Sequence, residues 1–170
     1  MDEHEQRQIL DSWLERHQGL LFKVVRAYAF TPHDREDLFQ EVASQVWNSI
    51  PRYRSESAET TWLYRVALFT AMRWSRKKWP HRDDTRSLEG LEHSLIEPAK
   101  PTDPRLDWLY EQIAQLDEVE RSLTLMMLDG FSYREIADTL GISEGNVGVK
   151  LTRIRKHLTE KSNDLHDEPR

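Results

Sequence analysis

The stretch SYREIADTLGISEGNVGVKLTRIRKHL, residues 132–158, has the start and stop signals of two helices joined by a tight turn. Ser132 and Glu135 have the spacing of a capping box at a helix start, and Gly141 suits the left-handed residue that follows a helix end. Ser143 stands where it can cap the next helix. Because the segment ERSLTLMMLDG before it is also helical in pattern, the sequence predicts a helix-turn-helix.

The last predicted helix has an apolar stripe and an outward face. The stripe is expected to be buried because its members recur at helical spacing: Val147, Leu151, Ile154 and Leu158. On the outward face, methyl groups of Val149 and Thr152 can pack on thymine methyls while Arg153 reaches guanine or phosphate. The remaining bases are better placed for the DNA backbone: Lys150, Arg155 and Lys156.

The formal net charge of -6 conceals a strong local pattern. Residues 62–79 and 145–157 contain bases and no acidic residue, whereas the rest of the chain is rich in acids. Phosphate binding depends on local charge, so both segments are candidates for contact with nucleic acid. The acidic background weakens nonspecific binding by the free protein, which indicates that a partner brings it to DNA.

Composition excludes several classes of protein. Cysteine is absent, so disulfides, thiolate zinc sites and cysteine catalysis are excluded, and a reducing cytosol is the simplest location. The start of the chain, MDEHEQRQIL, is acidic and polar, unlike a signal peptide. No apolar run approaches the ~20 residues that span a bilayer. We therefore expect a soluble cytoplasmic protein without membrane insertion.

The predicted fold is all-α, with two small helical domains. Glycine (6) and proline (7) are scarce, and helical periodicity covers residues 8–79 and 105–161. We expect domains at residues 5–79 and 105–162, joined by a proline-rich linker at 80–104. In the first domain, breaks are expected at Gly19 and at Pro51, and residues 162–170 are expected to form a frayed tail.

The helix predicted at residues 61–79 has two contrasting sides. One is expected to face the core: Leu63, Val66, Ala67, Thr70 and Trp74. The other interleaves bases with apolar groups: Arg65, Phe69, Met72, Arg73 and Arg76. Such a mixture suits unpaired nucleic acid, because bases stack on rings while Arg holds phosphates. Two buried faces of a crowded bundle explain the pattern equally well.

The helix predicted in DREDLFQEVASQVWNSI, residues 34–50, has an acidic polar side. Leu38, Val42 and Val46 form its core stripe. Off that stripe lie Asp37, Gln40, Glu41, Trp47 and Asn48. An acidic surface with a large aromatic residue repels DNA and suits a basic protein partner, although for this helix taken alone a solvated face is the better explanation.

Together these stretches resemble the extracytoplasmic-function class of bacterial RNA polymerase sigma factors. DREDLFQEVASQVW resembles the polymerase-binding helix of sigma region two, and PRYRSESAETTWLYRVALFTAMRWSRKK resembles the segment that reads and melts the −10 element. Residues 116–158 resemble region four, which reads the −35 element. The resemblance implies a non-enzymatic factor that directs promoter-specific initiation.

The resemblance also implies site residues and partners. Core polymerase, through its clamp helices and flap, would meet Asp37, Gln40, Glu41, Trp47 and Asn48. A loop that captures a flipped base would contain Arg52, Tyr53, Arg54 and Ser55, and the −10 strand would be held by Arg65, Arg73, Arg76 and Lys77. The −35 element would be contacted by Asn146, Val149, Lys150, Thr152, Arg153 and Lys156. An anti-sigma factor is an implied partner, and no cofactor or metal is implied.

Three positions depart from the family pattern. Asn146 stands where Thr is usual, and Gly148 stands where a basic residue is frequent. Because glycine offers no side chain and lowers helix stability by ~1 kcal/mol relative to Ala, weaker or altered −35 recognition is expected. Trp74 replaces a residue that tends to be small or polar, so a reshaped region-two core is expected.

Two other classes of protein remain as alternatives. A stand-alone helix-turn-helix regulator would bind duplex DNA tightly without polymerase. An enzyme is disfavoured because HRDD at 81–84 has no accompanying glycine-rich loop or DFG, and HExxH is absent. His33, Asp34 and Glu36 lie at a predicted helix start, where capping explains them.

Overall fold

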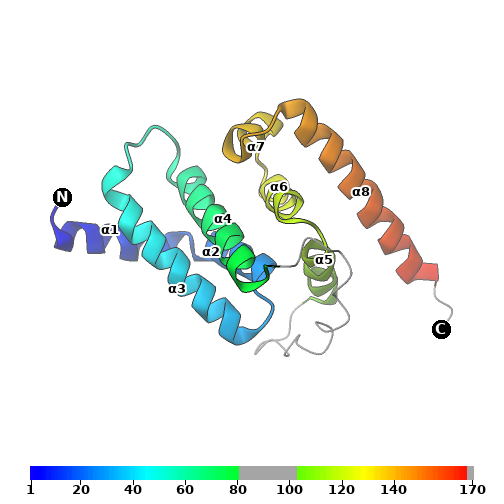
Figure 1. Ribbon diagram of the computed structural model, residues 1–170, viewed down its shortest axis with the longest axis horizontal. Coiled ribbons are helices and arrows are strands. Elements are labelled where there is room, and N and C mark those ends of the chain that lie inside the picture. The colour runs from blue at the N-terminus through cyan, green and yellow to red at the C-terminus, as the bar shows by residue number, and fades with distance from the viewer. Residues whose placement is uncertain (81–102, 168–170) are drawn as a thin grey trace. The chain divides into compact units, whose positions relative to one another are not determined.

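The computed structural model describes residues 1–80 and 103–167, and all regular structure in these ranges is helical (Figure 1). The chain divides into two compact units, Met1–Asp103 and Pro104–Arg170. The prediction of an all-α fold is therefore confirmed. Most of the predicted linker, 80–104, lies outside the described residues, as does HRDD. No helix within the described ranges has the length and apolar character needed to cross a membrane.

The first unit is a bundle of four helices. They are α1 (Glu3–Arg16), α2 (Gln18–Tyr28), α3 (Pro32–Ser49) and α4 (Glu59–Lys78), with a 3-10 turn, η1 (Ile50–Arg52), after α3. Helix α4 packs against both α2 and α3. The core between them is fully buried and contains Leu21, Tyr28, Leu38, Leu63, Tyr64 and Leu68.

Local sequence signals explain where these helices begin. Thr31 caps α3 by accepting a hydrogen bond from the Asp34 amide, and Pro32 occupies the first helical position as predicted. The break between α1 and α2 falls at His17, so the expectation of a break at Gly19 is wrong. Gly19 lies inside α2, because helical neighbours impose an ordinary helical conformation on a glycine that needs no special backbone angles.

The second unit contains α5 (Pro104–Ala114), α6 (Glu118–Leu128), α7 (Tyr133–Leu140) and α8 (Glu144–Asp167). Helices α6, α7 and α8 pack on one another around a core of Ile113, Leu123, Met126, Ile136, Val147 and Leu151. Arg121 is buried in α6, and its Nη2 donates to the carbonyls of Ala114 (3.0 Å) and Leu116 (2.9 Å). This arginine therefore fixes the connection between α5 and α6.

Helix α8 continues beyond its predicted end. The expectation of a frayed tail from residue 162 is wrong, because α8 runs to Asp167. The sequence between residues 158 and 167 contains neither glycine nor proline, so nothing there removes a helical hydrogen bond or favours a left-handed stop. The first such residue is Pro169.

Candidate nucleic-acid and partner interfaces

The helix-turn-helix forms through the predicted caps. Glu135 Oε2 accepts from the Ser132 amide (2.7 Å), and Ser132 Oγ accepts from the Glu135 amide (3.2 Å). The bond from the Ser132 amide, and secondarily one from the Ser132 side chain to the same carboxylate, lower the pKa of Glu135. Gly141 is left-handed (φ 70°), and Ser143 Oγ accepts from the Asn146 amide (3.1 Å). All the predicted capping interactions are confirmed, and they set α7 and α8 on either side of a short turn.

The outward face of α8 combines small uncharged side chains with two bases. Val149 is 60% exposed, whereas Val147, Leu151 and Ile154 are buried as predicted and Leu158 is half-buried. The Thr152 hydroxyl donates to the Gly148 carbonyl (2.8 Å), so its hydrogen is already used within the helix. The exposed face consists of Asn146, Val149, Thr152, Arg153 and Lys156.

The bases of α8 differ in what surrounds them. Lys150 Nζ lies 3.7 Å from Glu120 Oε1 of α6, and its side chain is only 23% exposed. Arg155 donates from Nη1 to the Tyr133 hydroxyl (3.2 Å) and from Nη2 to Met127 Sδ (3.2 Å). Arg153 is exposed and has no ion-pair partner among the described residues. Lys150 and Arg155, which we expected to meet phosphates, are thus engaged within the unit.

Tyr133 is a residue that the sequence analysis missed. It begins α7, and its ring lies so close to Gly148 that a Cβ added there would be 3.6 Å from Tyr133 Cε2. Tyr133 therefore covers Gly148 where α7 packs against α8, and the distance leaves room for a methyl group there. No local pattern connects the two positions, because the contact depends on the angle at which the turn sets the helices.

The loop before α4 rests on an aromatic cluster. The Tyr53 ring lies 5.2 Å from those of Trp13 and Trp62, and its hydroxyl donates to the Ser57 carbonyl (2.9 Å). Ser55 adopts φ 57°, a left-handed angle that tightens the loop. Arg52, Arg54 and Ser55 are exposed, whereas Tyr53 is half-buried. Three of the four predicted loop residues are therefore accessible. Tyr53 mainly anchors the loop by packing on Trp13 and Trp62.

A polar contact fixes the start of α4 to the first two helices. Glu59 Oε1 meets His17 Nε2 and lies 3.5 Å from Arg16 Nη2. His17 is the residue at which α1 and α2 separate. The pair thus joins that break to the base of the loop.

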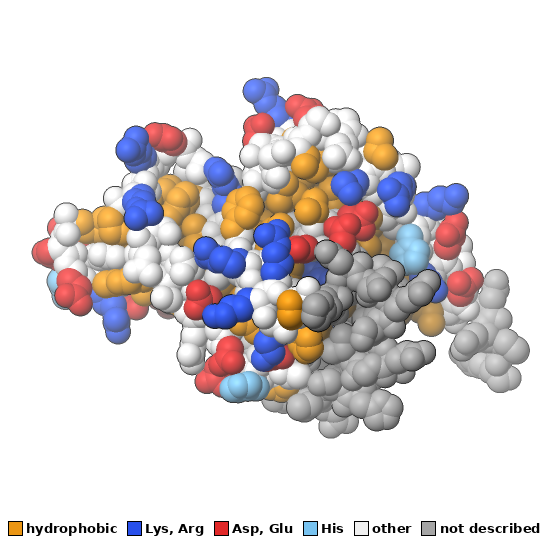
Figure 2. Space-filling view, in the orientation of Figure 1, with side chains coloured by type: hydrophobic (Ala, Val, Ile, Leu, Met, Phe, Trp, Pro, Cys, Tyr) orange, Lys and Arg blue, Asp and Glu red, His pale blue; other side chains and the backbone are white. Residues whose placement is uncertain are grey.

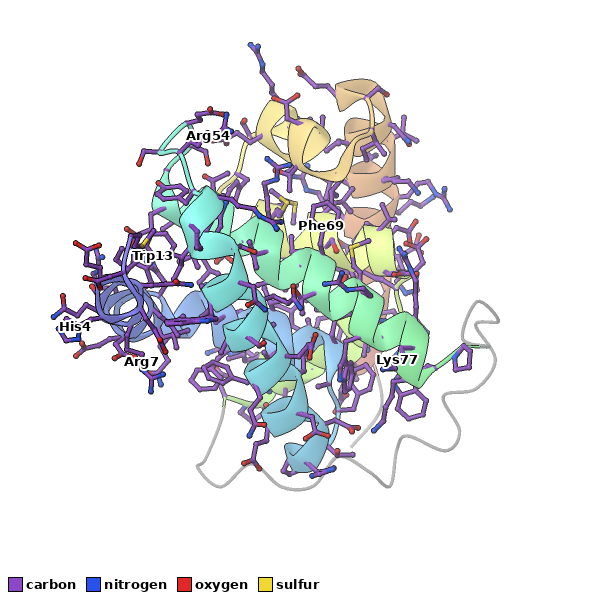
Figure 3. The ribbon with its side chains drawn as sticks, turned by 60° about the vertical axis from the view of Figure 1, so that its left-hand side comes forward. His4, Arg7, Trp13, Arg54, Phe69 and Lys77 are labelled. Carbon is purple, nitrogen blue, oxygen red and sulfur yellow. The ribbon has the colours of Figure 1, made fainter. Side chains whose placement is uncertain are left out.

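The exposed side of α4 is a basic stripe containing one aromatic ring. Its members are exposed: Arg65, Phe69, Arg73, Arg76 and Lys77. Figure 2 shows Lys and Arg side chains interspersed with hydrophobic ones over α3 and α4, and Figure 3 shows Phe69 and Lys77 along α4 with Arg54 in the preceding loop. Met72 was wrongly assigned to this side. It is 6% exposed, because it follows the buried Leu68 by one helical turn.

The polar side of α3 is arranged as predicted. Leu38, Val42 and Val46 are fully buried, and the opposite residues Asp37, Gln40, Glu41 and Asn48 are exposed. Trp47 is half-buried, and its carbonyl accepts from Gln6 Nε2 of α1 (2.7 Å). The side chains predicted to meet polymerase therefore share one accessible surface.

An open cavity of about 540 Å³ joins the predicted polymerase and DNA surfaces. It is lined by Asp37, Gln40, Glu41, Trp74, Lys77 and Lys78. Lys78 Nζ lies 2.7 Å from Asp34 Oδ1 and 5.7 Å from the Trp74 ring centroid. The hydrogen bond to Asp34 raises the pKa of Lys78. The charge of Lys78 is thus paired within the contact between α3 and α4. Within the described residues, no group of three or more His, Asp or Glu side chains is arranged to hold a metal.

Comparison with known proteins gives the same division of the chain. The family model described as Sigma-70 region 2 matches residues 13–81, and that of Sigma-70, region 4 matches residues 106–158. An ECF RNA polymerase sigma-E factor of Haemophilus influenzae is 24% identical over 164 residues, which cover 89% of this chain and 86% of the relative. The sigma-E factor of Escherichia coli K12 is 27% identical over 144 residues, which cover 78% of this chain and 75% of the relative.

Solved structures share the fold. The Bartonella quintana sigma factor RpoE, solved in complex with the anti-sigma factor NepR, superposes with a TM-score of 0.69 at 20% identity, covering 88% of this chain and 94% of that one. CnrH, solved with the cytosolic domain of CnrY, superposes with a TM-score of 0.65 at 20% identity. The match covers 95% of this chain and 91% of CnrH.

Proposed function

Since the chain belongs to the sigma-70 family, as a transcription initiation factor of the extracytoplasmic-function class, we propose that it binds core RNA polymerase through α3, captures the melted −10 strand with α4 and reads the −35 duplex with α8. The observation that carries this proposal is the presence of three accessible surfaces with different chemistry: acidic on α3, basic and aromatic on α4, and small side chains with two bases on α8. Members of this family are initiation factors and not enzymes.

The acidic surface of α3 supports the polymerase contact. Asp37 and Glu41 are exposed one helical turn apart, so they present two carboxylates to a single basic partner surface. The same charges repel the DNA backbone, which favours binding of DNA only after polymerase has positioned α4 and α8. Joining two weak DNA contacts in one assembly raises their effective concentration without any new contact.

The surface of α4 supports promoter melting. A protein that binds only the unpaired strand shifts the duplex toward opening, because its binding energy is available in the open state alone. The exposed Arg52 and Arg54 would lie in the loop that captures the flipped base, while the −10 strand continues along the stripe of α4. In α8, Val149, Thr152 and Arg153 would reach base edges of the −35 element.

Two further features belong to the proposal. The protein would act in the cytoplasm, where polymerase meets the chromosome. Because the two solved structures compared above are complexes with a second protein, one of them named as an anti-sigma factor, we propose that an anti-sigma factor also binds this chain when it is away from polymerase.

Run-off transcription with core polymerase and a library of promoter fragments tests the function. We expect transcripts from defined start sites that require this protein. Glu41→Lys should abolish them, because it places a cation on the polymerase-binding surface, whereas Glu15→Lys on the exposed side of α1 makes the same charge change elsewhere and should preserve them. Tight duplex binding by the free protein without transcripts would instead support a stand-alone regulator.

A further inference from the structure

Helix α4 begins without a side-chain cap of its own. Its N-cap residue is Ala58, whose side chain has no oxygen to accept a hydrogen bond from the first turn. Helices α3 and α7 begin differently, because Thr31 and Ser132 cap them locally. The predicted base-capture loop, residues 52–58, leads directly into the uncapped start of α4. The position of this loop therefore depends on contacts with other parts of the bundle.

The end of α1 supplies the first of these contacts. His17 Nε2 meets Glu59 Oε1 in the first turn of α4, and Arg16 Nη2 lies 3.5 Å from the same oxygen. The side chains of His17 and Glu59 are only 16% and 25% exposed, so water competes weakly for the contact between them. A carboxylate in the first turn is also favoured by the positive end of the helix. Glu59 thus ties the uncapped start of α4 to the end of α1.

Aromatic packing supplies the second contact. Tyr53 lies near the start of the base-capture loop, and its hydroxyl donates to the Ser57 carbonyl near the end of that loop (2.9 Å). The Tyr53 ring meets Trp13 of α1 edge-on at 5.2 Å between centroids, and it lies equally far from Trp62 of α4. Trp13 is 6% exposed, so this support belongs to the core of the bundle. Helix α1 therefore holds the loop near both of its ends, at Tyr53 and at Glu59.

The backbone between the two contacts is strained. Ser55 has φ 57°, in the left-handed region that residues with a Cβ disfavour. Such a conformation persists only where the surrounding structure imposes it. The exposed Arg52 and Arg54 lie within a few residues of this position. If the contacts at the ends of the loop were released, the backbone at Ser55 could relax and redirect both arginines.

We propose that His17 and Glu59 are positioning residues for base capture. Their contact holds the base-capture loop in the shape that accepts a flipped −10 base, although neither side chain touches the DNA. This inference rests on the proposed function, and it gives the end of α1 a part in promoter melting. A preformed loop loses less conformational entropy when it binds its ligand. Release of the contact should therefore weaken capture and leave binding of the −35 duplex and of core polymerase unchanged.

The proposal is tested with the full chain in complex with core polymerase. The probe is a fork-junction DNA of the promoter found by run-off transcription, in which each unpaired −10 nucleotide in turn is made abasic. For the wild type, one abasic position should weaken binding most, because it removes the captured base. His17→Ala and Glu59→Ala should each weaken binding of the intact fork by about 5- to 30-fold and shrink the penalty at that position by the same factor. The double variant should lose no more than either single variant, since all three remove one contact.

Two further variants separate positioning from other roles. His17→Gln keeps an N–H donor for Glu59 and should retain most of the abasic penalty. Asp11→Ala removes the exposed partner of Arg7 from the same helix, and it should behave as the wild type. Thermal unfolding and titration of core polymerase without DNA complete the set. Damage to the fold would weaken polymerase binding as well, whereas loss of positioning should weaken capture alone.

Four results would overturn the inference while the wild type still gives transcripts. One is a wild-type abasic penalty in both alanine variants. Additive losses in the double variant would be another, because the two side chains would then act separately. A third is an equal loss in His17→Gln and His17→Ala, which would show that the bond to Glu59 is not what matters. The last is a loss of polymerase affinity without DNA as large as the loss of fork binding. Failure of the proposed function is distinct, because the wild type itself would then give no transcripts.

Discussion

Helices α4 and α8 carry the two basic segments of the chain, and they use their charges differently. On α4, Arg65 and Arg73 are exposed and form no ion pair with any described residue. On α8, Lys150 approaches Glu120 and Arg155 binds Tyr133, so both bases help to assemble the second unit. Two segments that look equivalent by composition are thus one surface with available charges and one partly structural surface. Local charge identifies candidates, and the tertiary partners decide which of them are available.

This difference assigns the two helices separate tasks in the proposed initiation complex. Helix α4 offers several available cations and one ring, which suits a flexible single strand. Helix α8 offers a small patch around Val149 with one unpaired arginine, which suits a few base-edge contacts in a major groove. Binding of the −10 strand should therefore depend more steeply on salt than binding of the −35 duplex.

The largest effect is expected from removing the available charges of α4. The double variant Arg65→Ala/Arg73→Ala should weaken binding of the unpaired −10 strand and lower the slope of log affinity against log salt by about 1.4, at ~0.7 per phosphate contact. Binding by the polymerase complex at several salt concentrations measures both quantities. Arg7→Ala on α1 removes an exposed base that is paired with Asp11, and it is the control. An unchanged slope in the double variant would mean that Arg65 and Arg73 contact no phosphates. The proposed difference between α4 and α8 would then be wrong.

A pair of variants in α8 sharpens the comparison. Arg153→Ala should cost about 1–3 kcal/mol of binding to the −35 duplex, because it removes a base-edge or phosphate contact. Lys150→Ala should cost much less, since Lys150 Nζ already lies 3.7 Å from Glu120. Fluorescence anisotropy with a −35 duplex and the polymerase complex compares them. Equal losses would mean that Lys150 leaves Glu120 to reach DNA.

The capping box should affect the second unit alone. Ser132→Ala should lower its free energy of unfolding by about 1 kcal/mol at neutral pH. Because the folded pKa of Glu135 is lowered, the contribution of its carboxylate is present above the ordinary Glu range near 4.3 and is lost as pH falls through the folded pKa. Urea unfolding should therefore show the difference between Glu135→Gln and the wild type shrinking in acid. A difference that grows in acid would contradict this assignment.

The smallest effect is expected at Gly148. Gly148→Ala should raise the free energy of unfolding by up to ~1 kcal/mol, because alanine favours the helix and its Cβ would meet Tyr133 at an ordinary contact distance. Binding of the −35 duplex should stay unchanged, since Tyr133 already covers that position. Thermal unfolding and duplex titration test the two statements, and a stabilised protein with weakened −35 binding would show that DNA needs the glycine.

The sequence predicts features set by near neighbours. The caps at Thr31, Ser132 and Ser143 and the buried stripes of α3 and α8 follow from patterns within a few residues, and all are present. Contacts between distant segments could not be predicted. Lys150 meeting Glu120, Tyr133 covering Gly148 and Tyr53 joining Trp13 each depend on how helices cross. These contacts decide which side chains remain available to a partner and which are bound within the unit.

The most direct test of this division is a crossed binding measurement. The polymerase complexes of Arg73→Ala and Arg153→Ala are each titrated with two promoter DNAs, one with its −35 element scrambled and one with its −10 strand kept paired. We predict that Arg73→Ala weakens only the DNA that still offers an unpaired −10 strand, and that Arg153→Ala weakens only the DNA that keeps its −35 element. If both variants weakened both DNAs equally, the assignment of the single strand to α4 and of the duplex to α8 would be wrong.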